Sequence, residues 1–177
     1  MNTSLPSPPA DLAGTLLGHL DRQLASARRL LELVLHQHEA IRARRVDQVL
    51  TTMLEIQREM EARGALEDER EQVLRRAAGA LGMSTLDVTL ERLCSVIDDI
   101  AAQRARHHSA ELRGLLDEIS RKHAINRALM RQELAFLDHL TRLAGGEPGP
   151  GYDRDAVLRS AVPITPGAGL HALDARA

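Results

Sequence analysis

The stretch LLGHLDRQLASARRLLELVLHQHEAI, residues 16–41, decides the fold of this 177-residue chain. Its apolar residues recur at alternating spacings of three and four, which is the period of one face of an α-helix. The positions of this apolar seam are Leu17, Leu20, Leu24, Ala27, Leu31, Val34, His38 and Ile41. We therefore predict a helix of about ten turns, roughly 50 Å long. A helix of that length has to lie along partner helices, because a small globule cannot enclose it.

The amino-acid composition also favours long paired helices. The chain has no Trp, one Tyr and one Phe. Compact globules of mixed structure rely on aromatic side chains to fill their cores, so this core has to be built from Leu, Ile, Val, Met and Ala. That bias, with a helical period, is typical of coiled coils and helix bundles. We expect an all-α protein, an elongated antiparallel helical bundle or coiled-coil hairpin with a flexible C-terminal tail.

The pattern along the chain predicts an arm, a bundle and a tail. Residues 1–10 are rich in Pro and Ser and predict a disordered arm, while residues 145–177 are rich in Gly and Pro and predict the flexible tail. The helical bundle takes residues 11–144. Its predicted helices span about residues 11–43, 47–81, 85–105 and 108–143. The sequence leaves open whether residues 101–110 break the helix and whether the tail is ordered without a binding partner.

The second predicted helix has an interrupted seam. The seam begins with Val46, Val49, Leu50, Met53 and Met60. It then lapses over EARGALEDEREQ, residues 61–72, where Gly64, Glu67 and Glu71 stand at seam positions. Either the helix projects past its neighbours there or it bends at Gly64, because Gly costs about 1 kcal/mol relative to Ala inside a helix.

A change of element is expected after residue 81. Gly82 has the character of a helix terminator. Ser84 and Asp87 resemble a capping pair that begins the third helix. The seam of that helix is predicted at Leu86, Leu90, Leu93, Ile97 and Ile100.

The fourth predicted helix has an apolar face that covers about half of its circumference. The face consists of Leu112, Leu115, Leu116, Ile119, Ile125, Leu129, Met130, Phe136, Leu137, Leu140 and Leu143. A two-stranded seam is narrower, so this helix contacts more than one neighbour, or a neighbour and a bound client. A second copy of the chain can also cover the face, so a homodimer in the absence of a client and the oligomeric state stay open. His123 and Asn126 interrupt the face, either to fix the register of the bundle or to contact a client.

Charge and composition argue against several classes of function. The charges of the 23 basic and 25 acidic residues nearly cancel. The sequence has no run of basic residues, so we expect no nucleic-acid partner. No stretch approaches the roughly 18 apolar residues that a membrane span needs, so we expect no membrane insertion. The N-terminus lacks the pattern of a secretory signal. A single cysteine, Cys94, allows no internal disulfide and suits a cytoplasmic protein.

The candidate chemical residues favour a protein that is not an enzyme. His36 and His38 lie two apart and point in divergent directions on a helix, so they cannot share a metal. The adjacent His107 and His108 are interpreted as part of a solvated helix face, and Cys94 as a small core residue. Long paired helices also form no pocket in which a nucleophile and a base converge. We expect no catalytic residue, no metal and no cofactor.

The C-terminal half resembles a known family. The stretch HAINRALMRQELAFLDHLTRLAGG, residues 123–146, is followed by a Gly/Pro linker and by YDRDA, residues 152–156. This pattern resembles the end of the FlgN family of flagellar export chaperones. The matching positions are Asn126, Leu129, Leu137, Leu140, Leu143, Tyr152 and Asp153. Two positions depart from the family pattern, Ala156 in place of Gly and His123 in place of Asn.

The N-terminal half is similar to the family as well. It shows a leading Leu-rich helix, the basic-to-acidic junction RARRVDQVL at residues 42–50, a charged second helix and a Leu81–Gly82 terminator. The resemblance covers about residues 12–156.

The resemblance implies a cytosolic chaperone of flagellar type III export. Such a chaperone binds the C-terminal segments of hook–filament junction proteins, prevents their premature assembly and delivers them to the export apparatus. The client site is expected on the C-terminal helix and tail. The expected partner-binding residues are Asn126, Leu129, Met130, Phe136, Leu137, Leu140, Leu143, Tyr152, Asp153, Val157 and Leu158.

Two other functions fit the same helical pattern. One is a structural coiled-coil scaffold that self-assembles and has no client. The other is a different hairpin of flagellar export, either a regulator of the export ATPase or a chaperone of the filament-cap protein. A stable one-to-one complex with an export substrate distinguishes the chaperones from the scaffold.

Overall fold

The computed structural model describes residues 8–143, and all regular structure in that range is helical. The elements are the α-helices α1 (Pro8–Arg42), α2 (Val46–Leu81), α3 (Leu90–Cys94) and α4 (Asp99–Leu143), with a short 3-10 helix, η1 (Thr85–Asp87), before α3. The predicted all-α class is therefore confirmed. The predicted flexible tail and most of the predicted arm lie outside the described residues.

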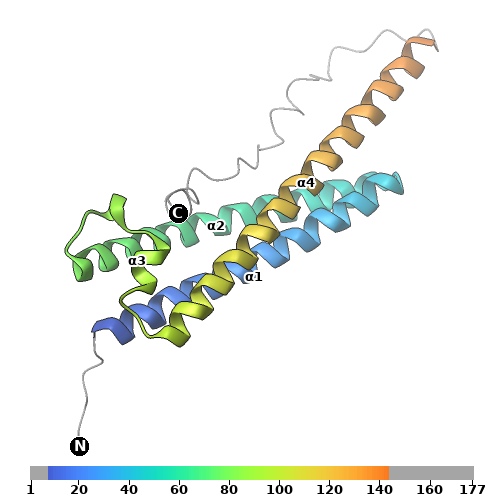
Figure 1. Cartoon of the computed structure of the whole chain (residues 1–177). Coiled ribbons are helices and arrows are strands. Elements are labelled where there is room, and N and C mark those ends of the chain that lie inside the picture. Colours follow the sequence, from blue (N-terminus) through green and yellow to red (C-terminus); the bar gives the residue numbers. More distant parts are fainter. Residues whose placement is uncertain (1–7, 144–177) are drawn as a thin grey trace, which may run out of the picture.

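Helix α1 packs against both of the other long helices (Figure 1). Its ion pairs with α2, Arg22–Glu69 at 2.8 Å and Arg29–Glu59 at 3.3 Å, show that the two helices are antiparallel. Its contacts with α4 run the other way, because Asp21 faces His108 and His38 faces Asn126. The expected antiparallel hairpin is thus α1 and α2, and α4 lies parallel to α1.

The prediction of one helix over residues 85–105 is wrong. Three residues that cap helix N-termini lie close together here, and each begins a separate element. Ser84 Oγ accepts from the Leu86 amide at 3.3 Å and starts η1. Thr89 Oγ1 accepts from the Arg92 amide at 3.3 Å and starts α3. Asp98 Oδ1 accepts from the Ala101 amide at 2.9 Å at the beginning of α4.

Helix α4 then continues unbroken through residues 101–110. The structure thus answers whether residues 101–110 break the helix. This polar stretch contains no Gly or Pro, so no residue in it opposes the helix. Two of the predicted seam positions near the break are not buried, since Leu86 is 89% exposed and Ile100 is 76% exposed.

Polar contacts bridge the lapse in the seam of α2. The helix runs unbroken through Gly64 and stays beside α1, so the alternative that it projects into solvent is wrong. The Arg63 guanidinium donates to Gln23 Oε1 and to Ser26 Oγ, both at 3.3 Å. Gln23 is buried, and the hydrogen bond from Arg63 gives its amide oxygen the partner that a buried polar group needs.

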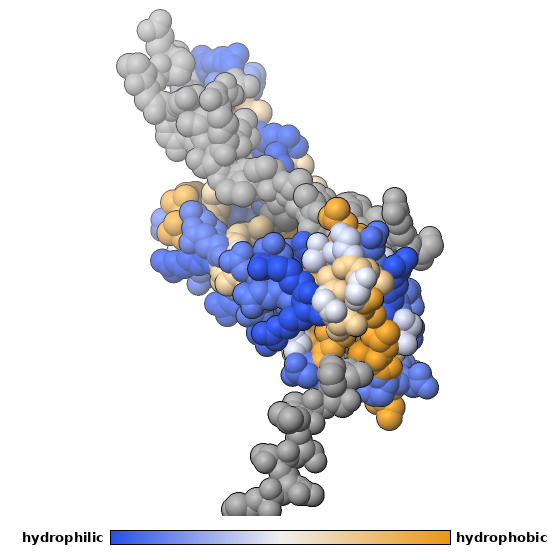
Figure 2. Space-filling model, turned by 90° about the vertical axis from the view of Figure 1, so that its left-hand side faces the viewer, coloured by the Kyte–Doolittle hydropathy of each residue, from blue (hydrophilic) through white to orange (hydrophobic). Residues whose placement is uncertain are grey.

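The apolar core forms two clusters along the bundle. One, at the end where α1 begins, unites α1, α2, α3 and the start of α4 around residues such as Leu16, Ala77, Leu93 and Ala105. The other lies further along between the three long helices and includes Leu24, Leu30, Val34, Ile56, Leu112 and Ile119. The end that holds α3 faces the viewer in Figure 2, where apolar surface gathers in one area among hydrophilic side chains.

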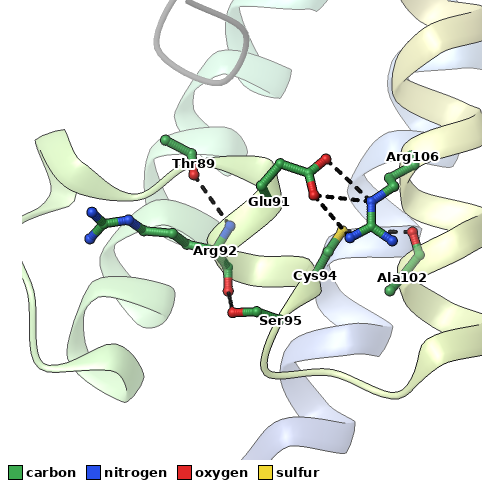
Figure 3. A network of polar contacts seen from close by, with 7 residues as sticks. All are labelled: Thr89, Glu91, Arg92, Cys94, Ser95, Ala102 and Arg106. Carbon is green, nitrogen blue, oxygen red and sulfur yellow. Dashed lines mark hydrogen bonds and ion pairs between the residues drawn. The ribbon is translucent and has the colours of Figure 1, made fainter. Parts of the chain in front are cut away.

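Helix α3 is held against α4 by the network in Figure 3. The Arg106 guanidinium on α4 donates to both carboxylate oxygens of Glu91, with contacts from 2.9 to 3.2 Å. Beneath this pair Cys94 is buried, and its thiol lies 3.6 Å from the Ala102 carbonyl oxygen. Burial raises the pKa of the Cys94 thiol. The residue packs as part of the core, as predicted, and is held in its unreactive thiol form.

Candidate partner-binding surface

The seam of α4 continues past the end of its partner α1. Leu112, Ile119 and Asn126 follow one another at intervals of seven and are buried. The next position, Glu133, pairs with Arg44 in the bend after α1, at 3.3 Å. Helix α1 ends at Arg42, whereas α4 runs on to Leu143. About ten residues of α4, or roughly 15 Å, extend beyond this ion pair (Figure 1).

The far part of α4 carries large apolar side chains, most of which are exposed. Leu143 is 70% exposed and Leu137 is 56% exposed. Leu134, Phe136 and Leu140 are also exposed, while Leu129 and Met130 are half-buried. We call this set the distal stripe, and it consists of Leu129, Met130, Leu134, Phe136, Leu137, Leu140 and Leu143. Six of its seven members are residues that the sequence predicts to bind a partner, and Leu134 is an addition.

Asn126, also predicted to bind a partner, is instead fully buried between α4 and α1. Its amide nitrogen donates to the Val34 carbonyl oxygen at 2.9 Å and to Gln37 Oε1 at 3.1 Å. Its amide oxygen lies 2.8 Å from His38 Nδ1. This network satisfies the side chain only in one alignment of the two helices, so Asn126 fixes the register of α4 on α1.

A second exposed apolar row lies at the start of α2. Val46, Leu50 and Leu54 follow one another at intervals of four and are 67%, 56% and 56% exposed. The sequence placed Val46 and Leu50 in the buried seam, and it gave Leu54 no role. Their spacing was the available signal, because residues four apart share one face of a helix. We call these three residues the α2 row.

A comparison with protein families shows which family the chain belongs to. The family model described as FlgN protein matches residues 12–160, most of the chain. The chain belongs to the FlgN family. FlgN proteins are chaperones of flagellar export and bind flagellar client proteins. Neither the search of curated proteins nor that of solved structures finds a match.

The predicted site of this FlgN-family chain is only partly within the described structure. The structure brings the residues of the distal stripe onto one end of α4. Tyr152, Asp153, Val157 and Leu158 lie outside residues 8–143.

Two features of the described residues bear on metal and small-molecule binding. Residues 8–143 contain no group of three or more His, Cys, Asp or Glu side chains placed to bind a metal. The cavity between α1, α2, α3 and α4, lined by His19 and Arg70 among others, measures about 30 Å³, enough for about one water molecule. None of the helices in this range is long and apolar enough to cross a bilayer.

His123 lies one turn before Asn126 and is an expensive residue to bury. Both of its ring nitrogens are buried and make no hydrogen bond within residues 8–143. Burial, with a smaller contribution from the charge of Arg127, lowers the pKa of His123 below its usual 6.5. The folded state therefore binds a proton at this site less readily than the unfolded chain does.

Replacing His123 by Leu is expected to reduce the loss of stability on acidification. Because the pKa is lower in the folded state, the unfolded chain takes up the proton first, so the free energy of unfolding falls as the pH drops below about 6.5. The leucine removes that proton uptake and the two unpaired nitrogens. Urea unfolding followed by circular dichroism at about pH 7.5 and about pH 5 measures the difference, with His139→Gln on the exposed surface as the control. An equally steep fall in both variants would show that His123 does not contribute.

Proposed function

We propose that this chain is a cytosolic chaperone of flagellar type III export, and that it binds the C-terminal segments of hook–filament junction proteins on the distal stripe. In this role it prevents their premature assembly and delivers them to the export apparatus. The observation that supports this proposal is the continuation of the α4 seam past the end of α1. The continuation leaves Phe136, Leu137, Leu140 and Leu143 exposed.

The distal stripe has the chemistry of a helix-binding surface. An amphipathic client helix can lay its apolar face on residues that repeat with the helical period, as in helix-in-groove recognition. Apolar burial stabilises such a complex by about 25 cal/mol for each Å² removed from water. The Asn126 network supports this role, because it holds α4 in the register that carries the stripe beyond α1.

The tail is the second part of the proposed client site. We propose that residues 145–162, with Tyr152, Asp153, Val157 and Leu158, become ordered on the client. Deleting residues 145–177 is then expected to leave the helix content nearly unchanged and to weaken client binding at least about tenfold. Circular dichroism and isothermal titration calorimetry measure the two quantities. An unchanged affinity would remove the tail from the site.

Size-exclusion chromatography tests the function as a whole. The chain is run alone and with C-terminal segments of candidate junction proteins. A monomer that shifts to a one-to-one heterodimer supports the chaperone. A homo-oligomer that no segment alters favours the structural scaffold. A shift only with the filament-cap protein or an export-ATPase subunit identifies one of the other export hairpins.

A further inference from the structure

We infer that the client helix also contacts α2, in a wedge between two helices whose second wall is the α2 row, level with the first turn of the distal stripe. This inference rests on the proposed function and adds a surface on a different helix. It also commits to the occupant, an amphipathic helix of the exported partner with apolar residues on two sides and acidic residues at its edge.

The α1–α2 hairpin has two sides, and α4 lies on one of them. Val34 and His38 contact Asn126 of α4. His36 lies two positions from each, about 200° around the helix, and lines a shallow pocket on the other side of the hairpin. The pocket side of α1 therefore faces away from α4.

Val46 and Leu50 of the α2 row lie on the α4 side of the hairpin. Gln48 and Thr51 of α2 line the same pocket as His36. Val46 and Leu50 are each two positions from Gln48, so both point about 200° away from it. The start of α2 thus turns its exposed apolar side chains toward the side on which α4 lies.

One half of the distal stripe faces the same space. Ser109 and Leu112 line the small cavity that α4 shares with α1, α2 and α3, so this side of α4 is turned toward the interior of the bundle. Met130 and Leu137 follow Ser109 at multiples of seven residues and continue that side toward the end of the helix. The other half of the stripe, which includes Phe136, is turned elsewhere, and this division accounts for a face too wide for one partner.

The two apolar walls do not cover each other. The backbones of α2 and α4 come close at few positions, and the far end of α4 projects past the tip of the α1–α2 hairpin (Figure 1). Leu50 and Leu137 are each 56% exposed. A client helix placed between the two walls would bury residues of both the α2 row and the distal stripe. A helix lying on α4 alone would leave the α2 row exposed.

Charge at the edge of the wedge favours an acidic occupant. Arg127 and Arg131 of α4 make no ion pair within residues 8–143, whereas the nearby carboxylates of Glu133 and Asp138 are paired with Arg44 and Arg142. The edge of the stripe therefore carries uncompensated positive charge. Complementary carboxylates on the client helix would be attracted to it and would set the orientation of the client.

Calorimetric titration of the full-length chain with the C-terminal segment of a junction protein tests the wedge. Leu50→Glu is expected to weaken binding at least about tenfold, because a half-exposed leucine that the client would bury becomes a charge. Thr51→Glu is the matched control. It places the same charge on the neighbouring exposed residue, on the pocket side of α2, and is expected to leave affinity unchanged. Arg127→Glu is expected to weaken binding most at low ionic strength.

The outcomes separate the wedge from the function itself. If Leu137→Glu weakens binding and Leu50→Glu does not, the client lies on α4 alone, so the wedge is wrong and the proposed function stands. If neither change matters, both are wrong. A tenfold gain of affinity on deleting residues 145–177 would assign the wedge to the chain's own tail. A wild-type dimer in sedimentation that Leu50→Glu dissociates would assign it to a second copy. Either result would overturn the inference.

Discussion

Replacing Leu137 and Leu140 together by Glu is expected to weaken the binding of a junction-protein C-terminal segment about 100-fold, or about 3 kcal/mol. Both side chains are exposed in the described structure and would be buried by the client. The substitution removes that apolar burial and places two charges where the client helix would exclude water. Isothermal titration calorimetry measures the change in affinity.

The control for this change uses the opposite face of the same helix. Ala128 and Ala135 are exposed and lie outside the distal stripe, so Ala128→Glu with Ala135→Glu adds the same charge without touching it. This double variant is expected to bind the client like the wild type. Circular dichroism of both variants is expected to be unchanged, since all four positions are at the surface. Equal loss of affinity in the two variants would mean that charge, and not the stripe, governs binding.

Replacing Asn126 by Ala is expected to lower the free energy of unfolding by about 2–4 kcal/mol. The substitution leaves Gln37 Oε1 and the His38 ring nitrogen without their amide partner and opens a cavity between α1 and α4. Gln132→Ala is the matched control, because Gln132 is an exposed amide on the same helix. Urea unfolding followed by circular dichroism measures both. A loss below about 0.5 kcal/mol would show that the network does not hold the two helices together.

The long helices could be predicted from the sequence because their signals are local and repeated. The seam between Leu17 and Ile41 recurs over many turns, and Gly82 ends α2 in the left-handed conformation that Gly adopts without strain, at a φ of 64°. The predicted ranges 11–43 and 47–81 therefore lie within a few residues of α1 and α2. The region after residue 82 was predicted incorrectly. Thr89 and Asp98 each begin a new helix, and only Ser84 was recognised as a cap.

The candidate site could be predicted only in part, for a different physical reason. An apolar residue at a helical period predicts a buried face, but it does not show where the partner helix ends. Leu137 is exposed because α1 stops at Arg42 while α4, in the register that Asn126 sets, runs past that point. Likewise Leu50 fits a buried seam by spacing, and it is exposed because the backbones of α2 and α4 come close at few positions. Asn126 itself interrupts the apolar face, and only its contacts with Val34 and Gln37 distinguish a register-fixing residue from a client contact.

Hydrogen exchange of α4, with and without a junction-protein segment, tests the central proposal most directly. Without the segment, the amides of residues 134–143 are expected to exchange much faster than those of residues 112–126, because most of the large apolar side chains on the projecting end are exposed. With the segment bound, residues 134–143 are expected to become protected while residues 112–126 stay as they were. Unchanged exchange of residues 134–143 in a saturated complex would show that the client binds elsewhere on the chain.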